Sequence, residues 1–330
     1  MKVLALESSC DETAGAIIED GHLLSSVVSS QIDIHSRFGG VVPEIAARKH
    51  LEIIDKIVGS SLEEAHLELE NIDVFASTMG PGLVGSLLVG LSFAKAMALS
   101  TNKPFIGINH LFGHVYANFL KYPFLRPPFM VLLVSGGHSE ILVLRDWDRI
   151  ELIGKTRDDA AGEAFDKIAR LLELGYPGGP AIQKAAEEGK VLYHFPRPLQ
   201  EKGNFDFSFS GLKTSVLYFL RKNPSVSVND VAASAQEAIV DSLVTKTFDA
   251  AGSLGLKEIA FAGGVASNFL LRDRAEKLSQ ETGIRAYFPP VDLCTDNAAM
   301  IAMVAYEKAK RGLFSPLSTN AVPYLSIDAF

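Results

Sequence analysis

A strand–turn–strand pattern that occurs twice constrains the fold of this chain more than any other feature. The first copy begins at Lys2 and closes in the turn 19–21, and the second begins at Met130 and closes in the turn 146–148. Each copy is an apolar run, a small polar turn and a second apolar run, which predicts a β-hairpin with exposed backbone N–H groups at its tip. The repetition predicts two similar lobes, and two tips facing each other would cradle phosphates.

Strand and helix patterns alternate behind each hairpin. Three segments have apolar residues at three- and four-residue spacing, which indicates helices: 43–58, 85–99 and 161–174. Three short apolar runs end in glycine or polar residues and are predicted to be strands: 74–78, 105–108 and 258–262. The alternation predicts an α/β fold with mixed or parallel sheets, arranged as two duplicated lobes around a central cleft.

The division between the lobes is predicted from a proline-rich connector, 122–128, that precedes the second hairpin. We expect the first lobe to span residues 1–118 and the second 119–296. The final helix, 297–311, lies in a segment, 297–330, that is expected to return to the first lobe. A chain of 330 residues that is 48% hydrophobic exceeds what one core of ordinary size needs, which agrees with two domains.

Charge and cysteine content exclude several classes of protein. With 31 basic and 39 acidic residues, the net charge of −8 argues against nucleic-acid binding by bulk electrostatics, so any RNA contact must be local or shared with a partner. Two cysteines, Cys10 and Cys294, exclude a disulfide framework and a four-thiolate zinc site. The longest apolar stretch, 84–99, is interrupted by Lys95 and falls short of the roughly 20 residues that cross a bilayer. No secretion signal is visible, so a cytoplasmic protein without a membrane partner is expected.

Two histidines have the spacing of metal ligands. His110 and His114 follow a predicted strand and Asn109, a plausible N-cap, so both imidazoles lie on one helix face. Asp296, at the start of the returning helix, is the expected third ligand. The residues alone leave another interpretation open, in which the histidines are solvated or hydrogen-bonded and Asp296 is an N-cap.

The duplicated hairpins, the segment 261–268 and the returning helix resemble the actin and sugar-kinase fold, which is ribonuclease H-like and binds nucleotides between its lobes. Over essentially its whole length the chain resembles the family of tRNA N6-adenosine threonylcarbamoyltransferases. The resemblance implies transfer of the threonylcarbamoyl group from threonylcarbamoyl-AMP to N6 of adenosine 37 in tRNA, with release of AMP. It also implies one divalent metal ion, zinc or iron, held by His110, His114 and Asp296.

Glycine-rich turns mark the expected substrate sites. A strand runs into two glycines, where a phosphate or carbonyl group can approach the backbone, although a plain hairpin turn explains the residues equally well. The resemblance implies that this segment binds substrate: Leu133, Val134, Ser135, Gly136 and Gly137. It assigns three further residues to the nucleoside half of the substrate: Asp166, Gly179 and Asn268. Asp166 has an alternative role in a surface pair with Lys167 or Arg170.

The first hairpin tip carries two carboxylates, Asp11 and Glu12, in a segment, 8–13, that matches a signature of the family. We expect one of them to position the reacting amine, because N6 must lose a proton as it attacks. Turns favour Asp in any case, which would explain Asp11 without chemistry. Two stretches are less informative: Gln183 stands where many bacterial relatives carry an acidic residue, and the family segment 206–213 suggests a core strand and turn rather than chemistry.

The resemblance implies several partners: tRNA, an inert actin-like paralogous subunit and a P-loop ATPase. The helix predicted at 43–58 is a candidate partner surface or an internal packing element. Three rival functions stay open. An actin-like ATPase or kinase would use ATP and magnesium and leave the histidines without a role, and a scaffold would need no metal site. A metallopeptidase, a label the family has also carried, needs Glu beside the first His, where Leu111 stands.

Overall fold

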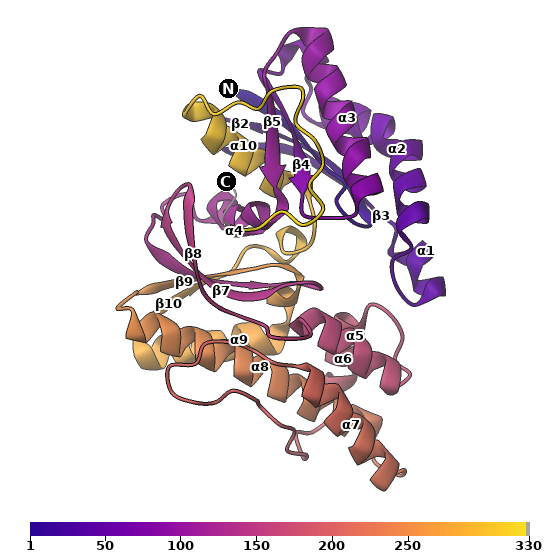
Figure 1. Ribbon diagram of the computed structural model, residues 1–330, viewed down its shortest axis with the longest axis vertical. Helices are drawn as coiled ribbons and strands as arrows, with labels where there is room; N and C mark the ends of the chain where they lie inside the picture. Colours follow the sequence, from indigo (N-terminus) through magenta and orange to yellow (C-terminus); the bar gives the residue numbers. More distant parts are fainter. Residues whose placement is uncertain (328–330) are drawn as a thin grey trace. The chain divides into compact units, whose positions relative to one another are not determined.

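The computed structural model describes residues 1–327, which form two compact units (Figure 1). The first unit comprises Met1–Leu125 and the C-terminal segment from Thr295, and the second is Arg126–Cys294. The first boundary therefore lies beyond the expected position at Asn118, because the helix that contains Asn118 continues to Lys121 before the proline-rich connector. The C-terminal segment joins the first unit from Thr295, two residues earlier than expected.

The first unit is built on a five-stranded mixed sheet with the order β3-β2-β1-β4-β5. Its strands are β1 (Lys2–Glu7), β2 (Glu12–Glu19), β3 (His22–Ser30), β4 (Val74–Gly80) and β5 (Phe105–Asn109). β1, β2 and β3 pair antiparallel, whereas β4 and β5 continue the sheet in parallel with β1. The central strands are almost continuously buried, as expected for strands covered on both faces.

Helices cover both faces of this sheet (Figure 1). They are α1 (Ile32–His35), η1 (Ser36–Phe38), α2 (Pro43–Glu64), η2 (Leu69–Asn71), α3 (Val84–Thr101), α4 (His110–Lys121) and α10 (Ala298–Lys310). α2 and α3 pack together on one face, and α10 packs against β1 and α4 on the other. Among the described residues, α3 alone has the length and hydropathy of a membrane span, and it packs on β4 through buried residues such as Leu87 and Leu91.

The second unit repeats the plan with the sheet order β10-β9-β6-β7-β8. Its strands are β6 (Phe129–Val134), β7 (Ser139–Asp146), β8 (Arg149–Lys155), β9 (Glu258–Ala262) and β10 (Arg285–Tyr287). Three antiparallel strands are again followed by two parallel ones. The prediction of two duplicated α/β lobes is confirmed, since each strand of one unit has a counterpart at the same place in the other.

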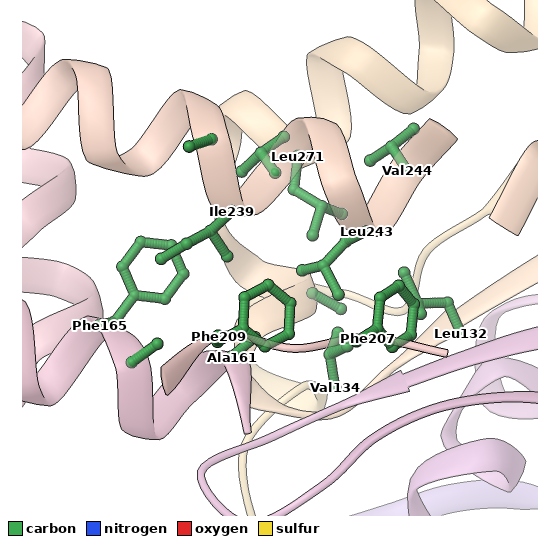
Figure 2. Close-up of a cluster of buried hydrophobic side chains, with 14 of the residues drawn as sticks. Leu132, Val134, Ala161, Phe165, Phe207, Phe209, Ile239, Leu243, Val244 and Leu271 are labelled. Carbon is green, nitrogen blue, oxygen red and sulfur yellow. The ribbon is translucent and has the colours of Figure 1, made fainter. Parts of the chain in front are cut away.

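The helices of the second unit form its core with one side of the sheet. They are α5 (Ala161–Leu171), α6 (Gly178–Glu187), α7 (Ser210–Lys222), α8 (Val228–Ser253), η3 (Gly264–Ser267), α9 (Phe269–Thr282) and η4 (Val291–Leu293). α8 packs on β6 and β9. Figure 2 shows the rings of Phe207 and Phe209 beside Val134 of the sheet and Leu243 of α8, all of them buried.

Candidate functional site

A capped helix start places the two histidines. β5 ends at Asn109, whose side-chain oxygen accepts a hydrogen bond from the backbone N–H of Leu111 at 3.0 Å, so α4 begins at His110. His114 follows one turn later on the same helix face. The two ring centroids lie 4.7 Å apart, edge to face, and both side chains are largely shielded from solvent. The spacing in the sequence thus produces the predicted pair of converging imidazoles.

Asp296 meets these histidines from the far end of the chain. Its Oδ1 atom lies 3.4 Å from Nε2 of His110 and 3.2 Å from Nε2 of His114. The N-cap of α10 is the neighbouring Asn297, whose Oδ1 accepts a hydrogen bond from the N–H of Met300 at 2.9 Å, so capping does not account for Asp296. Within residues 1–327, these three side chains form the one cluster with the geometry of a metal site, with ligand atoms within 4.8 Å of one another.

Gly113 allows α10 to approach the histidine-bearing helix. A Cβ atom at this position would lie 2.8 Å from Cδ1 of Ile301 and 3.1 Å from Cγ of Met300, closer than side chains normally pack. Both of these residues are on the first turn of α10, directly after Asp296 and Asn297. The glycine between the two histidines therefore sets the spacing of the helices that bring the three side chains together.

A buried carboxylate that the sequence analysis missed supports His110. Oε2 of Glu7 lies 2.9 Å from Nδ1 of His110, on the side of the ring opposite Asp296. Glu7 is fully buried at the end of β1, where Oε2 also accepts a hydrogen bond from the Thr78 hydroxyl at 2.7 Å and Oε1 accepts one from the N–H of Ser9 at 2.6 Å. The available signal was a carboxylate at the end of an apolar strand.

The charges around His110 favour a cation. Burial acts to lower the pKa of His110, but Asp296 and Glu7 outweigh it and raise this pKa well above its ordinary value. Burial acts to raise the pKa of Asp296, whereas His110 and His114 bring it far below the usual range. Positive charge in this place, whether a proton or a metal ion, is therefore stabilised by two carboxylates.

The donor set fits a zinc or iron ion. Two imidazole nitrogens and one carboxylate oxygen converge, and these are ligands that both metals accept. Nδ1 of His114, by contrast with that of His110, has no hydrogen-bond partner among the described residues. Burial, together with the charges of Asp11 and Asp296, raises the pKa of the nearby Cys10 thiol, which disfavours a thiolate as a further ligand.

The two carboxylates of the first hairpin tip differ in their surroundings. Asp11 is buried, and its backbone oxygen accepts a hydrogen bond from the N–H of Gln31. Burial, followed by the charges of Asp296 and Asp11, raises the pKa of Glu12 to about 9. The raised pKa favours the protonated form of Glu12 in the metal-free protein, and its Oε1 accepts a hydrogen bond from the Ser30 hydroxyl at 3.1 Å.

The second hairpin tip is a tight turn with open glycines. Ser135 Oγ accepts hydrogen bonds from the N–H groups of Gly137 and His138 at 3.4 and 3.2 Å. A Cβ atom at Gly136 or Gly137 would meet nothing within 4 Å, so the backbone of the tip is accessible to a ligand. The carbonyl of Ser135 accepts a hydrogen bond from the N–H of Gly162 near the start of α5, which joins the tip to that helix.

Asp166 lies beside the glycine turn as the sequence indicated. Its Oδ1 accepts a hydrogen bond from the N–H of Gly178 at 2.7 Å, and burial raises the pKa of its carboxyl. Lys167 pairs instead with Asp159 and Glu163, so the proposed surface pair with Lys167 is not formed. The Cβ position of Gly179 is open, which leaves this turn free to receive a ligand.

Asn268 and Gln183 are both held by hydrogen bonds within the second unit. Oδ1 of Asn268 caps α9 by accepting from the N–H of Leu271 at 3.0 Å, and its Nδ2 donates to Gln236 at 2.8 Å. Gln183 accepts a hydrogen bond from the N–H of Phe269 at 2.9 Å and so joins α6 to the start of α9. A nucleoside contact by Asn268 would therefore use its backbone or displace one of these bonds.

The segment 206–213 is structural, as its sequence suggested. Asp206 accepts hydrogen bonds from the N–H of Lys155 and from Arg157, and Thr156 forms a parallel bridge with Phe207. Asp158 binds the hydroxyls of Ser208 and Ser210 and both backbone N–H groups of residues 209–210. The segment thus extends the edge of the second sheet and starts α7.

Comparison with known sequences identifies one family. The family model for tRNA N6-adenosine threonylcarbamoyltransferase matches residues 22–303. A tRNA N6-adenosine threonylcarbamoyltransferase of Kosmotoga olearia is 67% identical over 327 residues, covering 99% of each chain. That of Thermosipho africanus is 53% identical over 330 residues and covers 99% of this chain and 100% of the relative.

Solved structures agree on the fold at low sequence identity. Full-length HypF in its phosphate- and nucleotide-bound form matches with a TM-score of 0.65 at 14% identity, covering 95% of this chain and 56% of HypF. The chain therefore spans about half the length of that protein. Component A of the Acidaminococcus fermentans (R)-2-hydroxyglutaryl-CoA dehydratase matches with a TM-score of 0.58 at 15% identity, covering 94% and 99%. These matches support the two-lobed actin-like fold alone.

Proposed function

The chain belongs to the tRNA N6-adenosine threonylcarbamoyltransferase family and so transfers a threonylcarbamoyl group to N6 of adenosine in tRNA, and we propose that this transfer depends on a metal ion. The proposed ligands are His110, His114 and Asp296, and the ion is zinc or iron. The proposed donor is threonylcarbamoyl-AMP, the acceptor is adenosine 37, and AMP is released.

The observation that supports metal dependence is the convergence of three donor atoms within 4.8 Å. The two histidines come from α4 and Asp296 directly precedes the N-cap of α10, and these two helices approach each other closely because Gly113 has no side chain. The alternative of a plain hydrogen-bonded cluster would leave two imidazoles and two carboxylates gathered in a largely buried place without a role. When bound, a divalent ion there supplies positive charge that polarises an oxygen of the threonylcarbamoyl group.

The transfer itself requires one bond to form and one to break. N6 of the adenosine attacks the carbamoyl carbon, the bond between that carbon and the phosphate oxygen breaks, and AMP leaves with the electron pair. N6 loses a proton in this step. Asp11 and Glu12 are the proposed groups at the reacting amine, and the protonated state of Glu12 suits a donor to a substrate oxygen.

We assign binding of the adenylate to the second unit. The proposed substrate-binding segment is Leu133, Val134, Ser135, Gly136 and Gly137. Within it, the open backbone at Gly136 and Gly137 would receive the charge that develops as AMP leaves, while the buried Leu133 and Val134 hold the turn in place. Asp166, beside the open turn at Gly179, would hold the ribose hydroxyls through charge-assisted hydrogen bonds. Asn268 would contribute chiefly by fixing the start of α9, since both ends of its side chain are engaged.

The partners beyond tRNA are proposals from the resemblance: an inert actin-like subunit and a P-loop ATPase, in the cytoplasm. α2 buries one face against the sheet and leaves Leu51 69% exposed on the other. An exposed leucine on an amphipathic helix suits a protein contact, so α2 remains a candidate partner surface although its other face packs internally.

The experiment incubates the purified chain, with its presumed partners, with threonylcarbamoyl-AMP and unmodified tRNA. We expect N6-threonylcarbamoyladenosine and AMP as products, and we expect the metal content to be lost together with product formation in His110→Ala/His114→Ala. Normal turnover by this double variant would remove the metal from the mechanism. Release of phosphate as the sole activity would favour the ATPase or kinase, and peptide cleavage would favour the peptidase.

A further inference from the structure

We propose that Glu7 is a positioning residue, which holds the imidazole of His110 so that Nε2 faces Asp296 and the metal ion. The inference rests on the proposed function, because it takes His110 as a ligand. Glu7 Oε2 lies 2.9 Å from Nδ1 of His110, while Asp296 Oδ1 lies 3.4 Å from Nε2. A ligating histidine with a carboxylate on its second nitrogen has a fixed ring orientation and greater basicity.

Glu7 is itself fixed on three sides. Its carboxylate accepts hydrogen bonds from the Thr78 hydroxyl, from the N–H of Ser9 and from Nδ1 of His110, and no part of the residue is exposed. Thr78 lies on β4, so the neighbouring strands β1 and β4 both determine where the carboxylate lies. Such a group can orient a ligand without moving itself.

The two histidines are therefore unequal. Nδ1 of His110 has Glu7 and, at 3.2 Å, the hydroxyl of Ser9, whereas Nδ1 of His114 has no partner among residues 1–327. His110 is held at both ring nitrogens, whereas His114 is held at Nε2 alone, by Asp296. Removing the carboxylate from Glu7 should thus weaken metal binding although Glu7 does not touch the ion.

The test is the zinc affinity of Glu7→Gln, measured on purified full-length protein by competition with a chelator. We expect binding to weaken about 10- to 100-fold, the usual effect of losing an outer-sphere partner. Thr78→Val, which removes one bond to Glu7, should weaken zinc binding by a smaller factor. Thermal unfolding of the zinc-free proteins shows whether each variant folds, and Glu7→Asp should recover part of the affinity.

A folded Glu7→Gln or Thr78→Val protein with wild-type zinc affinity would overturn the positioning role, even if its stability had fallen. The proposed metal site has a separate test in the same assay. If His110→Ala/His114→Ala binds zinc as tightly as the wild type, the ligand assignment is wrong, whereas the Glu7 variants leave that assignment intact.

A second and independent inference concerns α7. Residues 207–229 contain no Asp or Glu, although the chain as a whole has a net charge of −8. α7 is the one helix among the described residues that carries more than one Lys or Arg and no acidic residue: Lys213, Arg221 and Lys222. None of these three cations has an ion-pair partner within residues 1–327.

The outer face of α7 combines these charges with an exposed aromatic ring. Tyr218 is 57% exposed, and Arg221 and Lys222 follow it one turn later on the same exposed face. Leu212 and Val216 are buried on the opposite face. Unpaired cations beside an exposed ring are the features with which proteins bind a phosphate backbone and stack on an unpaired base.

We infer that this face of α7 contacts the tRNA substrate. The positive charge is complementary to the phosphate backbone, and a local patch is what an acidic protein needs in order to bind RNA. An acidic protein surface is the alternative occupant, but it offers no unpaired base to stack on the exposed ring of Tyr218.

The test is binding of unmodified tRNA to the full-length chain by fluorescence anisotropy across a salt series. Arg221→Glu/Lys222→Glu should weaken binding at least about tenfold near 0.1 M salt and flatten the salt dependence, since two phosphate contacts are lost. Tyr218→Ala should weaken it by a smaller factor. Lys277→Glu/Arg285→Glu is the matched control, because it makes the same change of net charge at two exposed cations elsewhere in the second unit.

Equal weakening by the control would show that only bulk charge matters and would overturn the assignment. Unchanged tRNA binding by the α7 variant, or no tRNA binding by the wild type at low salt, would overturn it as well. Loss of a protein partner with tRNA binding intact would assign α7 to that partner instead.

Discussion

The two hairpin tips have the same backbone plan and opposite chemistry. β1 ends at Glu7 and β2 begins at Glu12, whereas β6 ends at Val134 and β7 begins at Ser139, so each tip is four residues long and these positions correspond. Glu7 binds His110, while Val134 at the equivalent place belongs to the hydrophobic core. The duplicated fold therefore supplies two equivalent hairpin tips. The residues at the strand ends determine which of the two tips favours a cation.

The difference continues in the elements that follow. β5 leads into α4 with its two histidines, whereas β10, the counterpart of β5, leads into the short helix η4 within the described residues. The second unit has Gly136 and Gly137 where the first has Ser9 and Cys10, and it has His138 in place of Asp11. One unit thus offers fixed negative charge and imidazoles, and the other offers accessible backbone, which suits binding of an ion and of a phosphate-bearing ligand respectively.

The largest effect is expected when the two histidines of α4 are removed. His110→Ala/His114→Ala should reduce product formation by more than about 100-fold, because outer-sphere changes alone cost 10- to 100-fold and this change removes two ligands. Metal content by mass spectrometry and modified nucleoside by chromatography measure the outcome. His22→Ala/His194→Ala, at exposed positions, is the matched control and should leave both unchanged.

A second test introduces a carboxylate at Val134, the position at the end of β6 that is equivalent to Glu7. Val134→Glu places a buried charge where no histidine faces it, so we expect the free energy of unfolding to fall by about 3 kcal/mol or more, as for an uncompensated buried charge. Urea unfolding followed by circular dichroism measures this. Val134→Ala, which leaves only a small cavity, should lower the free energy of unfolding by less. A Val134→Glu protein as stable as the wild type would show that the two strand ends tolerate a carboxylate equally well.

A third test concerns the close approach of α10 to α4 in the first unit. Gly113→Ala should destabilise the protein by about 1–3 kcal/mol and weaken metal binding, because the new methyl group would lie 2.8 Å from Ile301. Gly59→Ala in α2 is the control: its Cβ would meet nothing within 4 Å, so it should be neutral or slightly stabilising. Similar effects of the two alanines would mean that helix spacing is not set by Gly113.

The last test concerns the titration of Glu12. With its pKa raised to about 9 from an ordinary value of 4.5, the folded metal-free protein keeps this proton to higher pH than the unfolded chain does. The free energy of unfolding should therefore fall as pH rises through this window, and Glu12→Gln should lack that contribution. Unfolding at about pH 5 and about pH 9 measures the difference. A roughly 100-fold loss of turnover in Glu12→Gln at neutral pH would instead identify Glu12 as a base.

Local patterns in the sequence predicted most of the fold, because hairpins and amphipathic helices are encoded by neighbouring residues. The helix that carries His110 and His114 was predicted from their spacing and from Asn109, and the returning helix from its apolar pattern. The end of the first lobe was predicted near Asn118 from the proline-rich connector, and the sequence has no signal for the point where α4 stops, which is Lys121.

Long-range contacts explain what sequence reasoning could not provide. Glu7 and His110 are 103 positions apart, and a single Glu at the end of an apolar strand gives no sign of its partner. Asp296 was predicted as the third ligand from its place at the start of the returning helix, and the family resemblance then supported that choice. For Asn268 a local signal did exist, since Asn before a helical pattern predicts an N-cap, and the structure has that cap.

The first unit is discontinuous in the chain, and this affects when it is completed during synthesis. Residues 126–294 emerge from the ribosome as one uninterrupted block that is able to fold while the first 125 residues are still without α10. β1, β2 and β5 gain their covering helix, and the histidines gain Asp296, only after residues 295–310 have been synthesised. A polypeptide that stops short of residue 296 thus has only two of the three proposed ligands.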